Sequence, residues 1–238
     1  MSQATAEGLP KLAPLEARTL VDQVVDAVIE GMATGVFLPG DRVIEAEVAR
    51  ALNVSRVPVR EALRLLESQG VVLNERYRGM RLMEVSAEGL DRIQRVRAAL
   101  ETLAVEEILA RLPENPDLLA PLEEAAAALR RAAEAGDSYG VARLDTAFHR
   151  QLCQLSGNDV IVKTWEPLSR QLTVIFGLST LEKDMASIAE EHDDVLRSLQ
   201  ARDPAPAVAM IRRHILDYSR EIDFEKLVAA RRQQRKQS

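Results

Sequence analysis

The sequence predicts a mainly α-helical protein in which one short β-hairpin separates an N-terminal helical segment from a longer, all-helical antiparallel bundle. Two observations lead to this fold class. Apolar residues recur at helical spacing through most of the 238 residues, whereas β-type patterns are confined to two short runs near residues 71–85. Aromatic residues make up only 3% of the chain, which argues against a Tyr- and Trp-rich β-sandwich.

The composition excludes several functional classes. With 31 basic and 37 acidic side chains, the net charge is −6, which argues against a general polyanion binder but not against one local basic face. The single cysteine, Cys153, excludes a disulfide framework and a Cys-based zinc module. The longest uncharged run near the middle, residues 171–181, is far too short to span a membrane. We therefore expect a soluble, cytoplasmic protein with no membrane partner.

The N-terminal elements follow from local signals. Residues 1–17 lack sustained periodicity and are expected to form a flexible lead-in. A helical pattern begins at Arg18 and stops near residues 31–35, and Pro39 with Gly40 marks a turn.

A second and a third helix are predicted next. A short helix from about Glu45 to Leu52 is followed by a tight connection. Ser55 is a suitable N-cap for the next helix, which places Pro58 in its first turn and ends before Gly70.

Two short strands are then expected at residues 71–73 and 80–85, joined by a polar loop. Helix, tight turn, helix and hairpin is the order of a winged helix-turn-helix, which we place at residues 18–85. Its second helix can enter a DNA major groove while the hairpin lies beside the backbone.

Basic side chains cluster on this segment. Residues 53–81 contain six arginines against three glutamates, a net charge of +3 inside an acidic chain. On its own, an arginine every four residues also fits an ordinary solvated helix face, but the surrounding elements favour DNA binding. The predicted DNA-binding residues are Ser55, Arg56, Arg60, Arg64, Arg78 and Gly79, and we also expect Arg76 and Arg81 to reach flanking phosphates.

From residue 86 onward every strong pattern is helical. We expect about six helices in a bundle over residues 86–228, and a frayed basic tail over residues 229–238. The predicted breaks lie at residues 113–116, 136, 157–158, 177–180 and 203–206.

Three histidines and an aspartate lie on the inward faces of these helices. Asp145 and His149 are four residues apart on one helix, while His192 and His214 lie on two others. A single inward histidine is more often a satisfied core residue than a ligand, but three with a carboxylate are costly to bury unless a cation collects them. From the pattern alone, a core cluster and a site for one Zn, Ni, Mn or Fe ion per chain both remain open.

The first domain resembles the DNA-binding domain of GntR-family bacterial regulators. The matching stretches are residues 38–41, 54–63 and 66–72. The resemblance places Ser55, Arg56 and Arg60 at DNA-contacting positions and Gly79 at the tip of the wing. Ala46 stands where some members carry a DNA-contacting arginine, so a contact at that position is not expected here.

The second domain resembles the helical FCD ligand-sensing domain of FadR-like GntR regulators. The matching stretches are residues 97–101, 145–150 and 156–158, together with Glu191, His192 and His214. The resemblance implies a metal held by Asp145, His149, His192 and His214. It also implies a small organic carboxylate effector bound beside Arg97, for which an ion pair with Glu101 is the competing structural role. Arg143, Arg170 and Trp165 are weaker effector candidates.

Three functions remain open at this point. The first is a homodimeric, nucleoid-associated bacterial regulator, commonly a repressor but in some relatives an activator, which reads a palindromic operator and responds to its effector. The second is a metal-dependent hydrolase fused to a DNA-binding domain, in which Glu191 or Asp193 is the base. The third is a pure metal sensor without an organic effector. We favour the regulator and do not expect an enzyme.

Overall fold

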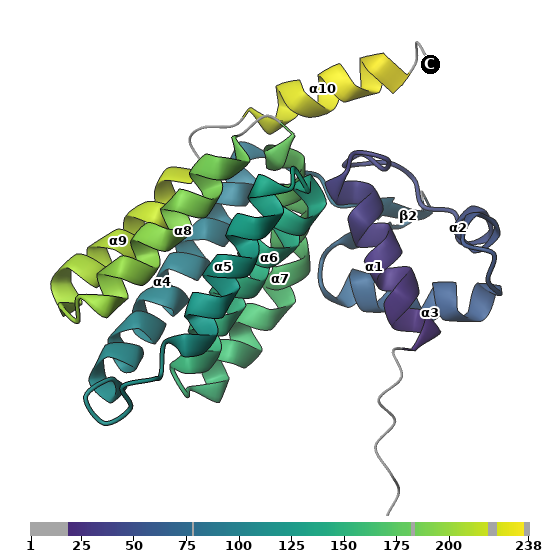
Figure 1. The fold of residues 1–238 in the computed structure, drawn as a ribbon. Coiled ribbons are helices and arrows are strands. Elements are labelled where there is room, and N and C mark those ends of the chain that lie inside the picture. The colour runs from purple at the N-terminus through teal and green to yellow at the C-terminus, as the bar shows by residue number, and fades with distance from the viewer. Residues whose placement is uncertain (1–18, 78, 182–183, 219–222, 236–238) are drawn as a thin grey trace, which may run out of the picture.

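The computed structural model describes residues 19–77, 79–181, 184–218 and 223–235 and shows two helical units side by side (Figure 1). The predicted lead-in, residues 1–17, lies outside the described residues. The N-terminal unit contains α1 (Leu20–Ala33), α2 (Glu45–Ala51), α3 (Arg56–Ser68), β1 (Val72–Glu75) and β2 (Gly79–Leu82). The second unit contains α4 (Ala87–Arg111), α5 (Ala120–Glu134), α6 (Ser138–Leu155), α7 (Asp159–Thr180), α8 (Met185–Gln200), α9 (Pro204–Tyr218) and α10 (Phe224–Arg235). The predicted fold class is confirmed.

The first unit forms as its local signals require. Thr19 and Asp22 cap α1 reciprocally, and the helix buries its apolar stripe against α3. Ser55 stands at the N-cap position of α3 with extended backbone angles, but within the described structure its hydroxyl makes no capping hydrogen bond. That exposed hydroxyl is therefore available at a helix N-terminus.

The loop of the hairpin is shorter than the sequence pattern predicts. β1 and β2 pair antiparallel with Val72 opposite Leu82 and Glu75 opposite Gly79, so the turn lies between Glu75 and Gly79. Gly79 has φ +81°, a backbone conformation that L side chains rarely adopt. The predicted second strand, residues 80–85, therefore begins one residue earlier and ends at Leu82.

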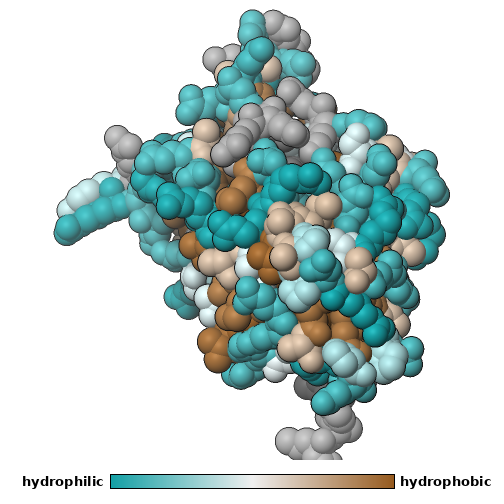
Figure 2. Space-filling model, turned by 90° about the vertical axis from the view of Figure 1, so that its left-hand side faces the viewer, coloured by the Kyte–Doolittle hydropathy of each residue, from teal (hydrophilic) through white to brown (hydrophobic). Residues whose placement is uncertain are grey.

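The helices of the second unit pack as a bundle that brings distant segments together. α6 contacts α5 and α7, while α4 contacts α9, α6 and α7, and α8 packs between α5 and α9. In Figure 1, α4 to α9 run side by side, and the face made by α4, α8 and α9 points away from the N-terminal unit. Figure 2 views this face and shows apolar residues scattered among polar ones. Among the described residues, no helix is long and apolar enough to cross a membrane.

Two expectations about this unit are wrong. The predicted break at residues 177–180 was placed too early, because α7 continues to Thr180 and the break before α8 follows it. The predicted frayed tail is helical as far as Arg235, where α10 ends, and it contacts the N-terminal unit. Arg232 donates to the carbonyl of Pro39 at 2.5 Å, and Arg235 lies 2.7 Å from Asp41.

Gly177 is a contact point between the two units rather than a helix break. A Cβ added at this position would lie 2.3 Å from the Cβ of Ala33, at the end of α1. The absence of a side chain is therefore what allows α1 and α7 to approach this closely.

We expect Gly177→Ala to destabilise the protein by about 1–3 kcal/mol, because the extra methyl group overpacks the α1–α7 contact. Urea unfolding followed by circular dichroism measures this change. Thr164→Ala, at an exposed position of the same helix, is the control. If Gly177→Ala is as stable as the wild type, then α1 and α7 can move apart to fit the methyl group with no loss in the free energy of unfolding.

Candidate metal centre and nucleic-acid interface

Four predicted ligands from three helices meet at one buried point. Asp145 and His149 come from α6, His192 from α8 and His214 from α9. The Nε2 atoms of His149 and His214 are 3.1 Å apart, and Asp145 Oδ1 lies 3.6 Å from His149 Nε2 and 3.5 Å from His192 Nε2. The structure thus brings together all four side chains that the sequence singled out.

Neighbouring groups orient the rings toward this point. His149 Nδ1 lies 2.6 Å from Glu101 Oε2, and His192 Nδ1 donates to the backbone carbonyl of Ile188 at 2.7 Å. His214 Nδ1 lies 3.8 Å from a carboxylate oxygen of Glu191. In each ring Nδ1 faces a carboxylate or carbonyl, so Nε2 is left to face the centre, which is the usual arrangement for metal-binding histidines.

The geometry and the donor types fit a divalent transition metal. Ligand atoms about 2.1 Å from one ion are about 3.0 Å apart at right angles and about 3.4 Å apart at the tetrahedral angle. The observed separations of 3.1, 3.5 and 3.6 Å fall close to these values. Imidazole and carboxylate donors suit Zn, Ni, Mn and Fe.

Two buried atoms at this point also need a partner. Within the described structure, Asp145 Oδ1 and His192 Nε2 make no hydrogen bond although both are inaccessible to solvent. Buried polar atoms are nearly always satisfied, and an unsatisfied one is destabilising. A cation between them satisfies both, so the residues present fit a metal.

Burial and neighbouring charges shift the pKa values of the cluster's side chains in different directions. Burial lowers the pKa of His149 and outweighs the nearby Glu101 carboxylate, so the imidazole stays neutral near neutral pH. Burial works to raise the pKa of Asp145, but the adjacent His192 holds it below its usual value. Burial works to lower the pKa of His192, but the Asp145 carboxylate holds it above its usual value.

Glu101 connects this cluster to the predicted effector arginine. Its carboxylate accepts hydrogen bonds from Arg97 Nε at 2.7 Å and from Trp165 Nε1 at 2.9 Å, in addition to its contact with His149. Burial works to raise the pKa of Glu101, but the Arg97 guanidinium and His149 lower it to about 2. The competing role of Arg97, an ion pair with Glu101, is therefore present.

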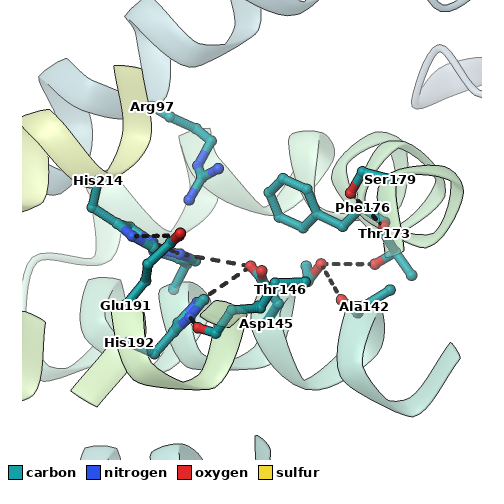
Figure 3. Close-up of polar contacts among 12 residues, drawn as sticks. Arg97, Ala142, Asp145, Thr146, Thr173, Phe176, Ser179, Glu191, His192 and His214 are labelled. Atoms are coloured by element: carbon teal, nitrogen blue, oxygen red, sulfur yellow. Dashed lines mark hydrogen bonds and ion pairs between the residues drawn. The ribbon is translucent and has the colours of Figure 1, made fainter. Parts of the chain in front are cut away.

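Arg97 nevertheless keeps one nitrogen without a partner. Nη1 donates to Gln94 Oε1 at 3.0 Å, while the buried Nη2 makes no hydrogen bond to the described residues. In Figure 3 the guanidinium points toward His214 and Glu191, with the ring of Phe176 beside it. Arg97 can thus hold Glu101 and present a donor to a ligand at the same time.

The cavity at this point is small. It is lined by Arg97, Asp145, His149, Phe176, Ile188, Glu191 and His214. Its volume is about 10 Å³, which is room for one ion or one water and not for an organic acid. A carboxylate effector would therefore need the lining to move.

The weaker effector candidates have other positions. Arg143 is exposed, and Arg170 donates to the Gln69 side chain, at the contact between the two units. Trp165 is buried and donates to Glu101.

Sequence reasoning treated Glu101 only as a partner of Arg97 and missed its contacts with His149 and Trp165. A signal for this network exists in the sequence. Gln94, Arg97 and Glu101 stand at i, i+3 and i+7 of α4, which places three polar side chains on one helix face. All three are at most 1% exposed, and a buried polar stripe on an otherwise aliphatic face indicates a site.

The predicted DNA-binding residues of α3 share one exposed surface, but they differ in their partners. Arg60 makes a two-pronged ion pair with Glu45 of α2, and Arg64 lies 3.2 Å from Glu61. The hydrogen bond to Arg60 lowers the pKa of Glu45 and raises that of Arg60. Arg56, the first residue of α3, is exposed and makes no ion pair with the described residues. Arg56 is therefore the readiest of these arginines to contact DNA.

The wing differs in part from expectation. Arg81 donates to the carbonyl of Gly40 at 2.9 Å and lies 3.6 Å from Glu75, so its guanidinium already has partners within the protein. Arg78 lies outside the described residues. Sequence reasoning missed Tyr77, which is 93% exposed with the Arg76 guanidinium 5.2 Å from its ring centre.

Comparison with known proteins agrees with both parts of the chain. Residues 20–82 match the family described as bacterial regulatory proteins, gntR family, and residues 92–217 match the FCD domain. A probable D-xylose utilization operon transcriptional repressor of Paenarthrobacter nicotinovorans is 28% identical over 86% of this chain and 89% of its own length. An uncharacterized HTH-type transcriptional regulator of Agrobacterium vitis is 32% identical over 62% of this chain and 88% of its own length.

A solved structure shows the same fold. McbR/YncC of E. coli superposes with a TM-score of 0.68 at 24% identity, covering 92% of this chain and 99% of that one. The family and these relatives are transcriptional regulators and not enzymes. The chain therefore belongs to the GntR family of bacterial regulatory proteins and is a DNA-binding transcriptional regulator with a C-terminal FCD domain.

Proposed function

We propose that the operator affinity of this regulator is controlled by a small carboxylate effector, bound beside a divalent metal in the helical unit. The observation that carries the proposal is the convergence of Asp145, His149, His192 and His214 beside Nη2 of Arg97, which makes no hydrogen bond to the described residues. Together these groups offer a cation and a guanidinium N–H, the two partners that a carboxylate prefers.

Each chain would hold one Zn, Ni, Mn or Fe ion through the four side chains. When bound, the ion supplies positive charge and open coordination positions to the effector's oxygens. Arg97 would donate from Nη2 to a carboxylate oxygen while its Nε remains on Glu101. The cluster thereby distinguishes an acid from a neutral compound of the same size.

Because the cavity is small, effector binding must move its lining, and this movement can be transmitted to the DNA-binding unit. A ligand can change operator affinity only if it prefers one arrangement of the protein over another. Because the cavity has room for one ion, an organic acid must displace side chains from α4, α7, α8 or α9. α7 in turn contacts α1, where Gly177 lies against Ala33. Entry of the effector would therefore strain a packed contact between the two units.

We further propose that the protein is a homodimer that binds a palindromic operator and represses transcription. A two-fold symmetric dimer would present two copies of α3 to two half-sites. The repressor name of the Paenarthrobacter nicotinovorans relative supports the direction of regulation.

The proposal is tested with metal-loaded protein, its operator DNA and a panel of small organic acids. A thermal-shift screen finds the acids that bind the native state, and fluorescence anisotropy then measures operator affinity with each of them. We expect at least one acid to stabilise the protein and to change operator affinity. Operator affinity that follows metal concentration and ignores every acid would instead identify a pure metal sensor.

Arg97→Lys should weaken the effector response by about tenfold, because lysine keeps the positive charge but loses the forked donor geometry. The operator affinity without effector should stay unchanged, since Arg97 is buried in the bundle. The measurement is the effector concentration that half-shifts operator binding. Arg95→Lys, at an exposed position of the same helix, is the matched control. An identical dose curve for Arg97→Lys would assign Arg97 to structure alone.

A further inference from the structure

One buried carboxylate contacts both halves of the proposed site. Glu101 is fully buried and lies within hydrogen-bond distance of three side chains that are each 1% exposed: Arg97, His149 and Trp165. These partners come from three helices, α4, α6 and α7. Arg97 is the proposed effector contact and His149 is a proposed metal ligand.

The chemistry of the partners decides which atoms carry protons. Arg Nε and Trp Nε1 are donors only, so Glu101 Oε1 accepts from both at 2.7 and 2.9 Å. Glu101 Oε2 lies 2.6 Å from His149 Nδ1, and a carboxylate oxygen there accepts a hydrogen bond from the ring N–H. His149 is then the Nδ1–H tautomer, and its Nε2 lone pair faces Asp145 and His214.

The same carboxylate sets the direction of Arg97. Glu101 holds Nε and Gln94 holds Nη1, so the planar guanidinium has only one orientation left. In that orientation the third nitrogen, Nη2, is buried without a hydrogen bond to the described residues. Arg97 also lines the cavity beside Asp145, His149 and His214.

We propose that Glu101 is the positioning residue of this site, which fixes the metal-binding tautomer of His149 and aims Arg97 at the effector position. The inference rests on the proposed function and adds that metal loading and effector recognition share one residue. Its loss should therefore weaken both, although Glu101 contacts neither the metal nor the effector.

Glu101→Gln is the sharpest substitution because it preserves the shape of the side chain and replaces one hydrogen-bond acceptor by a donor. The amide oxygen can still accept from Arg97 and Trp165, but the NH₂ group then faces His149 Nδ1. The ring must accept there and carry its proton on Nε2, the atom that faces the centre. We expect the affinity for Zn²⁺ to fall by about 10- to 100-fold, the usual effect of changing a partner of a metal-binding histidine.

The experiment combines Zn²⁺ titration against a chelator with ¹⁵N NMR of the histidine rings in metal-free protein. The wild type should show His149 as Nδ1–H, and Glu101→Gln should show it as Nε2–H. The indole of Trp165, the single tryptophan, should change its emission in this variant. Glu106→Gln, at an exposed position of the same helix, should match the wild type in every readout.

The outcomes separate this inference from the proposed function. Wild-type protein that binds no Zn²⁺ contradicts the metal site, whereas an Nδ1–H ring in the metal-free wild type still supports the role of Glu101. An Nε2–H ring in the wild type overturns the inference, and this measurement needs no variant to fold. Equal Zn²⁺ affinity in Glu101→Gln and wild type also overturns it.

Discussion

A His149→Ala protein is expected to lose bound metal, with its affinity for Zn²⁺ reduced by more than about 100-fold, since changes in ligand partners alone cost 10- to 100-fold. His149 occupies the centre of the proposed site. Its Nε2 is 3.1 Å from His214 and 3.6 Å from Asp145, and its Nδ1 is held by Glu101. The substitution removes a ligand and also leaves one oxygen of a buried carboxylate without its partner.

Elemental analysis of protein incubated with Zn, Ni or Mn and then dialysed measures this effect. The wild type should retain about one ion per chain and His149→Ala almost none. Thermal unfolding gives a second readout, because a ligand that binds only the native state raises Tm, and the rise grows with the logarithm of its affinity. The wild type should gain stability on metal addition, while His149→Ala should not.

Arg150→Ala is the control for these measurements, since Arg150 is an exposed neighbour on α6 that pairs with Glu166. It should retain the metal and the metal-dependent rise in Tm. Wild-type protein that holds no metal under any loading condition would rule out the centre. A His149→Ala protein that still holds one ion would show that the ligand set is different.

An Arg56→Ala protein should bind operator DNA more weakly by about 1–3 kcal/mol, or roughly 5- to 150-fold, if Arg56 makes a two-pronged base contact. Arg56 is the first residue of α3, is exposed and makes no ion pair with the described residues. Arg60 should contribute less, because DNA must compete with Glu45 for its guanidinium. We therefore expect Arg60→Ala to have the smaller effect of the two.

Fluorescence anisotropy at several salt concentrations measures both variants against operator and random DNA. Loss of a base contact lowers the preference for the operator, whereas loss of a phosphate contact weakens all DNA binding and lowers its salt dependence. Arg92→Ala removes the same charge from an exposed position of α4 and is the control. Wild-type affinity in both Arg56→Ala and Arg60→Ala would show that α3 is not the reading helix.

The structure also shows how the helical unit holds the DNA-binding unit. Gln171 of α7 donates to the backbone carbonyl of Gln69, at the end of α3, at 2.7 Å. Arg232 of α10 donates to the carbonyl of Pro39, in the segment before α2. These contacts hold the DNA-binding unit from two helices of the second unit, so a shift in the bundle can change its orientation.

The sequence by itself determined the order of the elements and which side chains could form the candidate metal centre. Helix and hairpin signals are local, since they depend on spacing and caps within a few residues, and the Asp145 and His149 spacing places both on one face of α6. The sequence also predicted that His192 and His214 point toward the core, because apolar periodicity indicates which side of a helix is buried.

Only the tertiary structure decided which buried groups meet. Periodicity identifies a buried face but not its partner, so the contacts of Glu101 with His149 and Trp165 had to come from the packing of α4, α6 and α7. For the same reason the sequence could not reveal the role of Gly177, which locally resembles a helix break but contacts Ala33 of α1. It also explains Arg60, whose partner Glu45 lies on another helix. Local sequence sets each helix and its faces, whereas pairing depends on distances between segments that only the folded chain fixes.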